Sequence, residues 1–174
     1  LQFSAEPFLN LGAVELDELR LVYNKVNDLK SDGDILRIAM KSLGQLDTVP
    51  KSSPLRFLGY VSILESIITH HPAPKDPYDS LTRQVAQKML LVGHRSIIPI
   101  PYELFGSQVN RKKLWNQLYD YRSKIAHGAA PEFNGRFQRL KDFPTVLEFI
   151  SSATVAVMRQ ALEEPKLIAD LREC

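Results

Sequence analysis

The chain has 174 residues, which is the usual size of one domain. Hydrophobic residues make up 44% and charged residues 24%, so the composition is that of a globular protein and excludes wholesale disorder. The formal net charge is only +2, so any surface that binds nucleic acid must be a local patch.

Cysteine and hydropathy indicate the compartment. The only cysteine is Cys174, which excludes a disulfide framework and a cysteine-rich zinc site and is typical of a reducing environment. No apolar run approaches the roughly 18 residues of a membrane span, and no signal peptide is recognised. We therefore expect a cytoplasmic protein without a membrane partner. Because the chain begins with Leu1 and not with Met, we expect it to be part of a longer protein.

The first half of the chain predicts helices. Residues 1–13 have no clear period and are expected to form an irregular lead-in. Apolar residues then recur every three or four positions over 14–30 and 34–46, with Ile38 expected on the buried face of the second helix. Ser53 and Pro54 are a helix start signal for a third helix over 54–70, which is apolar on most sides and includes Leu55. A proline-rich loop follows.

The second half continues the helical pattern. A fourth helix is predicted to run to about residue 92, with Asp79 or Ser80 as its cap and Gly93 as its end. An irregular segment over 96–106 is expected to follow. A fifth is predicted over 110–126 with Gly128 as its stop, and a sixth from Asp142 to about residue 162, before a short tail helix. The fold class we predict is all-α, as a single domain over 1–174 with about five long helices plus short terminal helices.

Several common chemistries are excluded by their missing motifs. The chain has no GxxxxGK[ST] loop, no GxGxxG, no HExxH and no GxSxG. His70 and His71 are adjacent but no third ligand lies near them in the sequence, so we expect a solvated helix end there. We predict no metal site and no cofactor.

The segment 111–128 concentrates positive charge. It holds one acid, Asp120, and five cations, so it carries +4 (five minus one) while the whole chain carries +2. Local positive charge of this kind attracts phosphate groups, and we assign the cations other than Arg122, together with Tyr119, to a candidate RNA-binding set. Tyr121 lies on the apolar face of the helix and Trp115 is expected to pack in the core. The cations are Arg111, Lys112, Lys113, Arg122 and Lys124.

Arg122 and His127 form an Arg-x4-His pattern, which alone occurs about once by chance in a chain of this composition. Its position gives it weight, because it ends a long helix directly before a stop glycine. Five residues turn an ideal helix by about 500°, so the two side chains point about 140° apart. They converge only if the helix loosens near Gly128 or if a second subunit supplies its own pair. Ser123 is one turn before His127 and can hydrogen-bond its ring.

The sequence Tyr-Arg-Ser-Lys-Ile-Ala-His-Gly at 121–128 closely resembles the signature of HEPN domains, in particular the Apea-like group. An earlier helix of that group carries a Leu-Glu pair before apolar residues, and Leu64 and Glu65 fit this place. The resemblance covers about 54–162. It implies a helical bundle that is usually a homodimer and in many members a metal-independent endoribonuclease of toxin–antitoxin, abortive-infection or RNA-processing systems.

The resemblance also assigns site residues. Arg122 and His127 map onto the catalytic pair, Ser123 takes the place where the wider superfamily often has Asn, Asp or His, and Glu65 is the polar residue that faces the motif. The implied partners are RNA, a second copy of the chain, and an antitoxin or defence-system protein. In the alternative, the chain is a non-catalytic HEPN module that binds a partner protein, a nucleotide or RNA, or a structural helical domain of a larger defence protein.

The position of Glu65 in its helix leads to a further prediction. It lies in the middle of a largely apolar helix, where an unpaired charge is costly. We therefore predict that Glu65 contacts Arg122 or a nearby hydroxyl. In the alternative interpretation without catalysis, Glu65 and Arg122 form a structural ion pair, and His127 only complements the helix dipole.

Overall fold

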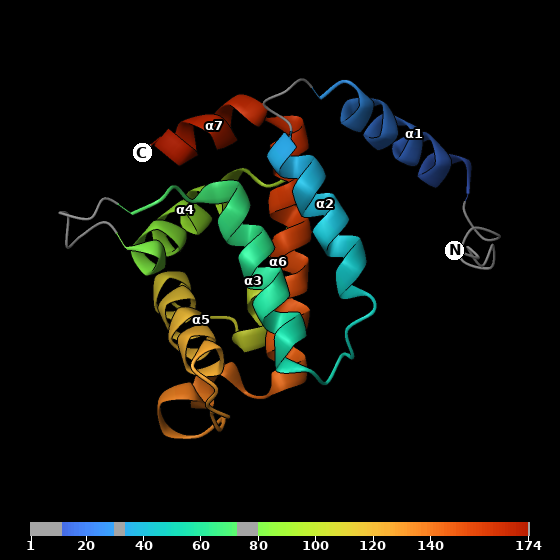
Figure 1. The fold of residues 1–174 in the computed structure, drawn as a ribbon. Helices are drawn as coiled ribbons and strands as arrows, with labels where there is room; N and C mark the ends of the chain where they lie inside the picture. The colour runs from blue at the N-terminus through green and yellow to red at the C-terminus, as the bar shows by residue number, and fades with distance from the viewer. Residues whose placement is uncertain (1–11, 30–33, 73–79, 174) are drawn as a thin grey trace. The chain divides into compact units, whose positions relative to one another are not determined.

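The computed structural model describes residues 12–29, 34–72 and 80–173. In these ranges the chain forms helices and no strand, which confirms the all-α prediction (Figure 1). None of the helices described is both long enough and apolar enough to cross a membrane. The chain divides into two compact units, Leu1–Asp34 and Ile35–Cys174, which are described separately. The single domain over 1–174 stays a prediction.

The first unit contains helix α1 (Ala13–Asn27). The helix ends at Asp28, whose backbone N–H donates to the carbonyl oxygen of Asn24 at 2.9 Å. Leu16 and Leu19, two of the regularly spaced apolar residues that predicted this helix, are exposed. The predicted lead-in is largely outside the described residues, as is Lys30 at the predicted end of the helix.

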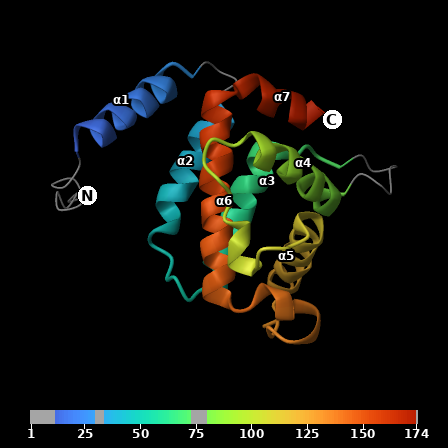
Figure 2. The same ribbon diagram turned by 180° about the vertical axis from the view of Figure 1, so that it is seen from behind.

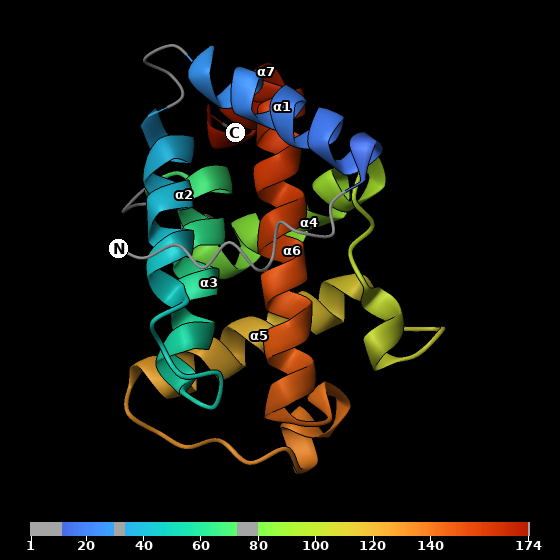
Figure 3. The ribbon, with the colours of Figure 1, turned by 90° about the vertical axis from the view of Figure 1, so that its right-hand side faces the viewer.

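The second unit is a bundle around two parallel helices. α3 and α6 run side by side, and α5 crosses the direction of α6 (Figures 1 and 3). The predicted long helices are confirmed, and the two short 3₁₀ helices η3 and η4 were not predicted. The elements are α2 (Asp34–Leu46), α3 (Pro54–Ile68), α4 (Leu81–Arg95), η3 (Tyr102–Phe105), α5 (Arg111–Ala126), η4 (Gly135–Leu140), α6 (Phe143–Glu163) and α7 (Pro165–Glu173).

Side-chain caps begin the helices where the sequence places them. Ser53 Oγ accepts a hydrogen bond from the backbone N–H of Leu55 at 3.3 Å at the start of α3. Asp142 Oδ1 accepts from the N–H of Thr145 at 2.8 Å at the start of α6. Each bond satisfies a backbone donor that has no partner inside the helix, so the cap fixes the first turn.

The core of the second unit lies between α3 and α6. Leu64 of α3 and Phe149 of α6 are fully buried. The segment between α4 and α5 runs along α6 (Figure 2), and its Tyr102 and Phe105 pack against Phe149 with ring centroids 5.5 and 5.1 Å apart. Trp115 of α5 contacts the same ring at 5.4 Å and is buried, as predicted. These contacts hold α5 against the bundle.

Three details of the sequence prediction are wrong. Gly93 does not end α4, which continues to Arg95 because the N–H of Ser96 still donates to the helix, to the carbonyl oxygen of Val92 at 2.8 Å. Ile38 is 64% exposed, and its neighbour Leu36 is buried in its place. Leu55 is also exposed, since it lies in the first turn of α3 beyond the edge of the core.

Candidate functional site

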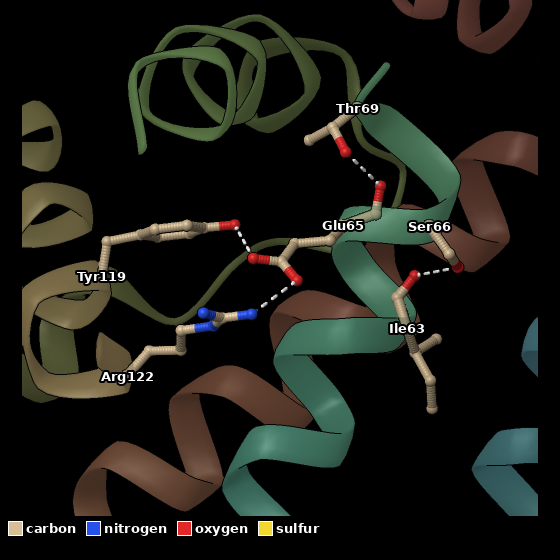
Figure 4. Close-up of polar contacts among 6 residues, drawn as sticks. All are labelled: Ile63, Glu65, Ser66, Thr69, Tyr119 and Arg122. Carbon is tan, nitrogen blue, oxygen red and sulfur yellow. Dashed lines mark hydrogen bonds and ion pairs between the residues drawn. The ribbon is translucent and has the colours of Figure 1, made fainter. Parts of the chain in front are cut away.

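The candidate site lies between α3 and α5, where Tyr119 and Arg122 point towards Glu65 (Figure 4). Tyr119 and Arg122 are three residues apart on α5 and therefore share a face of that helix. A ring contact between Phe57 and Tyr121, with centroids 5.4 Å apart, packs the same two helices together. The site is thus formed by two elements whose relative position is fixed by buried aromatic side chains.

Each oxygen of the Glu65 carboxylate has one donor. The Tyr119 hydroxyl donates to Oε1 at 2.6 Å, and Arg122 Nη2 donates to Oε2 at 3.4 Å, where it also forms an ion pair. The prediction that Glu65 contacts Arg122 or a nearby hydroxyl is confirmed on both counts. The donors offset the cost of removing the carboxylate from water.

Burial differs strongly across this cluster. Tyr119 is buried, the side chain of Glu65 is 13% exposed, and that of Arg122 is 33% exposed. A guanidinium has five N–H donors in a planar fork. Arg122 therefore lies at the edge of the core, where it pairs with Glu65 and still reaches solvent.

Tyr119 is a fixed hydrogen-bond donor. Burial raises the pKa of its phenol well above the ordinary value, and the negative charge of Glu65 and the hydrogen bond to it raise this pKa further, while Arg122 lowers it in part. The hydroxyl therefore stays protonated through neutral pH. Tyr119 was placed in the candidate RNA-binding set, but its ring is buried among the helices and its hydroxyl is directed at Glu65.

His127 caps the C-terminus of α5, and its side chain is exposed. Its backbone N–H donates to the carbonyl oxygen of Ser123 at 3.1 Å, so the helical pattern continues through this residue. Gly128 then adopts a left-handed φ of 78°, and the N–H of Ala129 donates to the carbonyl oxygen of Lys124 at 3.0 Å. The predicted stop at Gly128 is confirmed, as a Schellman motif.

Because α5 does not loosen before Gly128, Arg122 and His127 keep the divergence of about 140° that an ideal helix gives. Arg122 faces α3 and Glu65, whereas His127 is exposed at the helix end. Within the described part of the chain, the ring of His127 and the hydroxyl of Ser123 form no hydrogen bond with each other. Ser123 is exposed, so it does not orient His127 in this structure.

The candidate RNA-binding cations lie at both ends of α5. Arg111 stacks on the ring of Tyr102 at 4.5 Å, and Lys112 and Lys113 are exposed in the same first turn. Lys124 is exposed in the last turn. Eleven residues separate Lys113 from Lys124, which gives about 17 Å along the axis and only about 20° around it. These two lysines therefore lie on one stripe of the helix.

The middle of this stripe contains a cation that sequence reasoning missed. Arg136 of η4 forms an ion pair with Asp120, the only acid of the basic segment. The backbone carbonyl oxygen of Arg136 also accepts a hydrogen bond from Gln117 Nε2 at 2.9 Å. The pair offsets the one negative charge on α5. No periodicity signals it, because η4 is brought to α5 by tertiary contacts.

The contact of Tyr119 with Glu65 was also missed, although the sequence holds a signal for it. Tyr119 lies three residues before Arg122 on α5, so any partner of Arg122 is within reach of Tyr119.

His70 was expected at a solvated helix end. Its ring instead contacts Gln84 Nε2 at 3.1 Å and Lys88 Nζ at 3.2 Å. In the described ranges no three His, Cys, Asp or Glu residues are grouped as metal ligands would be.

Comparison of the chain with known protein families, with curated proteins and with solved structures finds no match in any of the three. The site residues Glu65, Tyr119, Arg122 and His127 offer a guanidinium held by a carboxylate and an exposed imidazole five residues further along α5. The same helix also carries exposed lysines.

Proposed function

We propose that the chain is a metal-independent endoribonuclease of the HEPN type. The observation that carries the proposal is the contact of Glu65 with Arg122, which joins the two helices that the family resemblance pairs. A guanidinium fixed by a carboxylate and partly exposed is suited to bind a phosphate diester. The lysines of α5 add a positive surface along which an RNA backbone can lie.

The proposed reaction uses the nucleophile that RNA carries. The 2′-oxygen attacks the adjacent phosphorus and loses its proton, while the bond from phosphorus to the 5′-oxygen breaks and that oxygen gains a proton. The products are a 2′,3′-cyclic phosphate and a 5′-hydroxyl. His127 transfers a proton in this reaction, since imidazole exchanges protons near neutral pH. Arg122 stabilises the charge that builds on the phosphorane oxygens.

Glu65 and Tyr119 are positioning residues in this proposal. Glu65 limits the orientations of the Arg122 guanidinium, and the Tyr119 hydroxyl fixes the other oxygen of that carboxylate. Ser123 is exposed beside Arg122 and adds a polar group on the RNA side. Because Arg122 and His127 diverge on one helix, we propose a homodimer in which the Arg122 of one subunit and the His127 of the other act on the same phosphate.

A second candidate function is a non-catalytic HEPN module that binds a partner protein, a nucleotide or RNA. One observation favours it: two thirds of the Arg122 side chain is buried and it already has an anionic partner. In either case, the proposed biological setting is a defence or toxin–antitoxin system, with an antitoxin or defence protein as a further partner.

The test is cleavage of a labelled RNA in the presence of EDTA. His127→Ala and Arg122→Ala should each lower the cleavage rate at least about 100-fold, the range expected for loss of a proton-transfer or charge-stabilising group. His94→Ala is the matched control, because His94 is exposed in the last turn of α4 and should not change the rate. Folding is checked by circular dichroism.

Two further outcomes separate the candidates. A substrate with 2′-deoxyribose at the cleaved position should be bound and not cut, since it lacks the nucleophile. If the unmutated protein binds RNA with an affinity that falls steeply with salt but cuts none, the binding module replaces the nuclease. Equal cleavage by the His127→Ala and His94→Ala variants would refute the catalytic role of His127.

A further inference from the structure

A groove of about 680 Å³ lies away from the candidate nuclease site, where α3 and α6 begin. Both helices start at the same end of the bundle and run in parallel (Figure 1). The groove has no residue in common with the cluster around Glu65. Its volume is within the range of about 300–1,000 Å³ that small-molecule sites occupy.

Part of the groove lining is apolar and partly aromatic. It is formed by Phe143, Pro144 and Leu147 from the first turns of α6, and by Tyr60 of α3. Tyr60 is buried, and Phe143 and Leu147 are half-buried with the remainder of their surface open to solvent. A flat apolar ring can cover this surface and remove it from water.

The groove is also lined by a buried arginine of α3 that is already oriented. Arg56 Nη1 donates to the carbonyl oxygen of Val49 at 2.7 Å, and Nη2 donates to Asp47 Oδ1 at 3.1 Å. The side chain of Arg56 is 11% exposed, whereas that of Asp47 is 80% exposed. The bond to Val49 fixes the guanidinium from inside, so a carboxylate that binds it loses little side-chain entropy. The contact with the exposed Asp47 shows that Nη2 can donate to a carboxylate.

The charges around the groove limit the ligand to one negative charge. Lys51 and Arg56 are the cations that line it, and Glu148 is an acid that lines it too. Asp47 is exposed and holds Arg56 only by a solvent-screened ion pair, which is worth little. A second negative charge on a ligand would be repelled by Glu148.

We propose that this groove binds a small aromatic monocarboxylate. The ligand carboxylate takes the place of Asp47 on Arg56, Lys51 adds a second positive charge, and the ring covers Phe143 and Leu147. The ligand therefore competes with Asp47 for Arg56, so removal of the Asp47 charge should raise the affinity for the ligand.

The test is isothermal titration calorimetry of the full chain with 2-naphthoate, with 2-naphthylmethanol as the neutral probe of the same ring. We expect one saturable site for 2-naphthoate and at least about 10-fold weaker binding of the alcohol, because the charge-assisted bond is lost. Asp47→Asn should strengthen naphthoate binding about 3- to 10-fold, since it removes the competing carboxylate. Lys51→Ala should weaken it by a similar factor.

The controls keep the outcome decisive. Asp47 and Lys51 are exposed, so their variants should remain folded, as circular dichroism would verify. Ser151→Phe narrows the groove and should abolish binding. No naphthoate binding at 1 mM would overturn the proposal. So would equal affinity for the acid and the alcohol, or an affinity that Asp47→Asn leaves unchanged or lowers.

Discussion

Glu65 is the residue on which the candidate site depends. A carboxylate on a helix that packs in the core is tolerated only when donors replace the water it loses. Here the Tyr119 phenol and the Arg122 guanidinium each donate a hydrogen bond to one carboxylate oxygen. Arg122 remains partly exposed to solvent. The same contact that stabilises the carboxylate also orients the arginine.

The Tyr119 hydroxyl should contribute measurably to stability. Tyr119→Phe removes one of the two donors to a largely buried carboxylate, and bonds to charged groups are worth about 1.5–3 kcal/mol. We expect the free energy of unfolding at pH 7 to fall by about 2 kcal/mol in urea titrations. Tyr121→Phe is the matched control, because Tyr121 is buried on the same helix and none of the described residues hydrogen-bonds its hydroxyl. It should change stability by less than about 0.5 kcal/mol.

Alkaline pH provides a second control for this contact. The pKa of Tyr119 is raised in the folded state, so its stabilising effect is complete below the unfolded value near pH 10 and is lost as the pH rises above it. The difference in stability between the unmutated protein and Tyr119→Phe should therefore shrink above about pH 10. A difference that grows there would show that the phenol is not the donor.

The sequence predicted that Glu65 contacts a donor, and it named Arg122. It did not identify Tyr119 as the second donor. A lone acid in an apolar helix predicts a donor nearby, and Arg122 was the nearest candidate by family resemblance. The only sequence signal for Tyr119 is its spacing of three residues from Arg122, because the contact with Glu65 itself depends on the packing of α3 on α5. Tyr119 was accordingly assigned to RNA binding and not to the core.

The end of α5 decides where His127 points. The Schellman motif requires a residue with left-handed backbone at Gly128, whose φ is 78°, and keeps the preceding turn helical. A side chain at this position would clash with the backbone at a cost of about 1–2 kcal/mol. The glycine therefore determines where α5 ends.

Two glycines of the second unit should respond to alanine with opposite signs. Gly128→Ala should lower the free energy of unfolding by about 1 kcal/mol, because alanine is strained at positive φ. Gly44→Ala should raise it by about 0.5–1 kcal/mol, since Gly44 lies inside α2 and an added Cβ meets no atom within 4 Å. Thermal unfolding followed by circular dichroism measures both. A Gly128→Ala variant as stable as the unmutated protein, or more stable, would contradict this account of the α5 terminus.

Helices were predictable here because their signals are local. Ser53 and Asp142 cap α3 and α6 through hydrogen bonds to residues two and three positions away, so the sequence alone contains both partners. Gly93 misled the prediction because it remains helical beside Tyr102, a residue of η3. η3 and η4 were missed for the same reason, since they depend on contacts with α5 and α6 and not on a period.

At the scale of the second unit, α5 presents its groups in two directions. Arg122 points towards α3, His127 is exposed at the helix end, and Lys113 and Lys124 share one stripe of the helix surface. A phosphate held by Arg122 is therefore not the phosphate that the His127 of the same chain faces. The proposed nuclease needs a second copy related by a twofold axis, which repeats each residue across the cleft.

A shared site predicts a defined activity for mixed dimers. Arg122→Ala and His127→Ala chains are each inactive alone in the proposed mechanism. When equal amounts are unfolded together and refolded, about half of the dimers contain one chain of each kind, and one of the two sites in such a dimer has both an intact arginine and an intact histidine. The mixture should therefore regain about a quarter of the unmutated cleavage rate.

The matched control for that experiment is the double variant Arg122→Ala/His127→Ala mixed with the unmutated chain. A shared site leaves no working site in those mixed dimers, so the mixture should retain only about a quarter of the full rate, from unmutated homodimers. A site formed within one chain would give the other pattern, with about half of the rate in this control and none from the two single variants. Light scattering on each mixture establishes that dimers are present, and a monomer under all conditions would contradict the shared site directly.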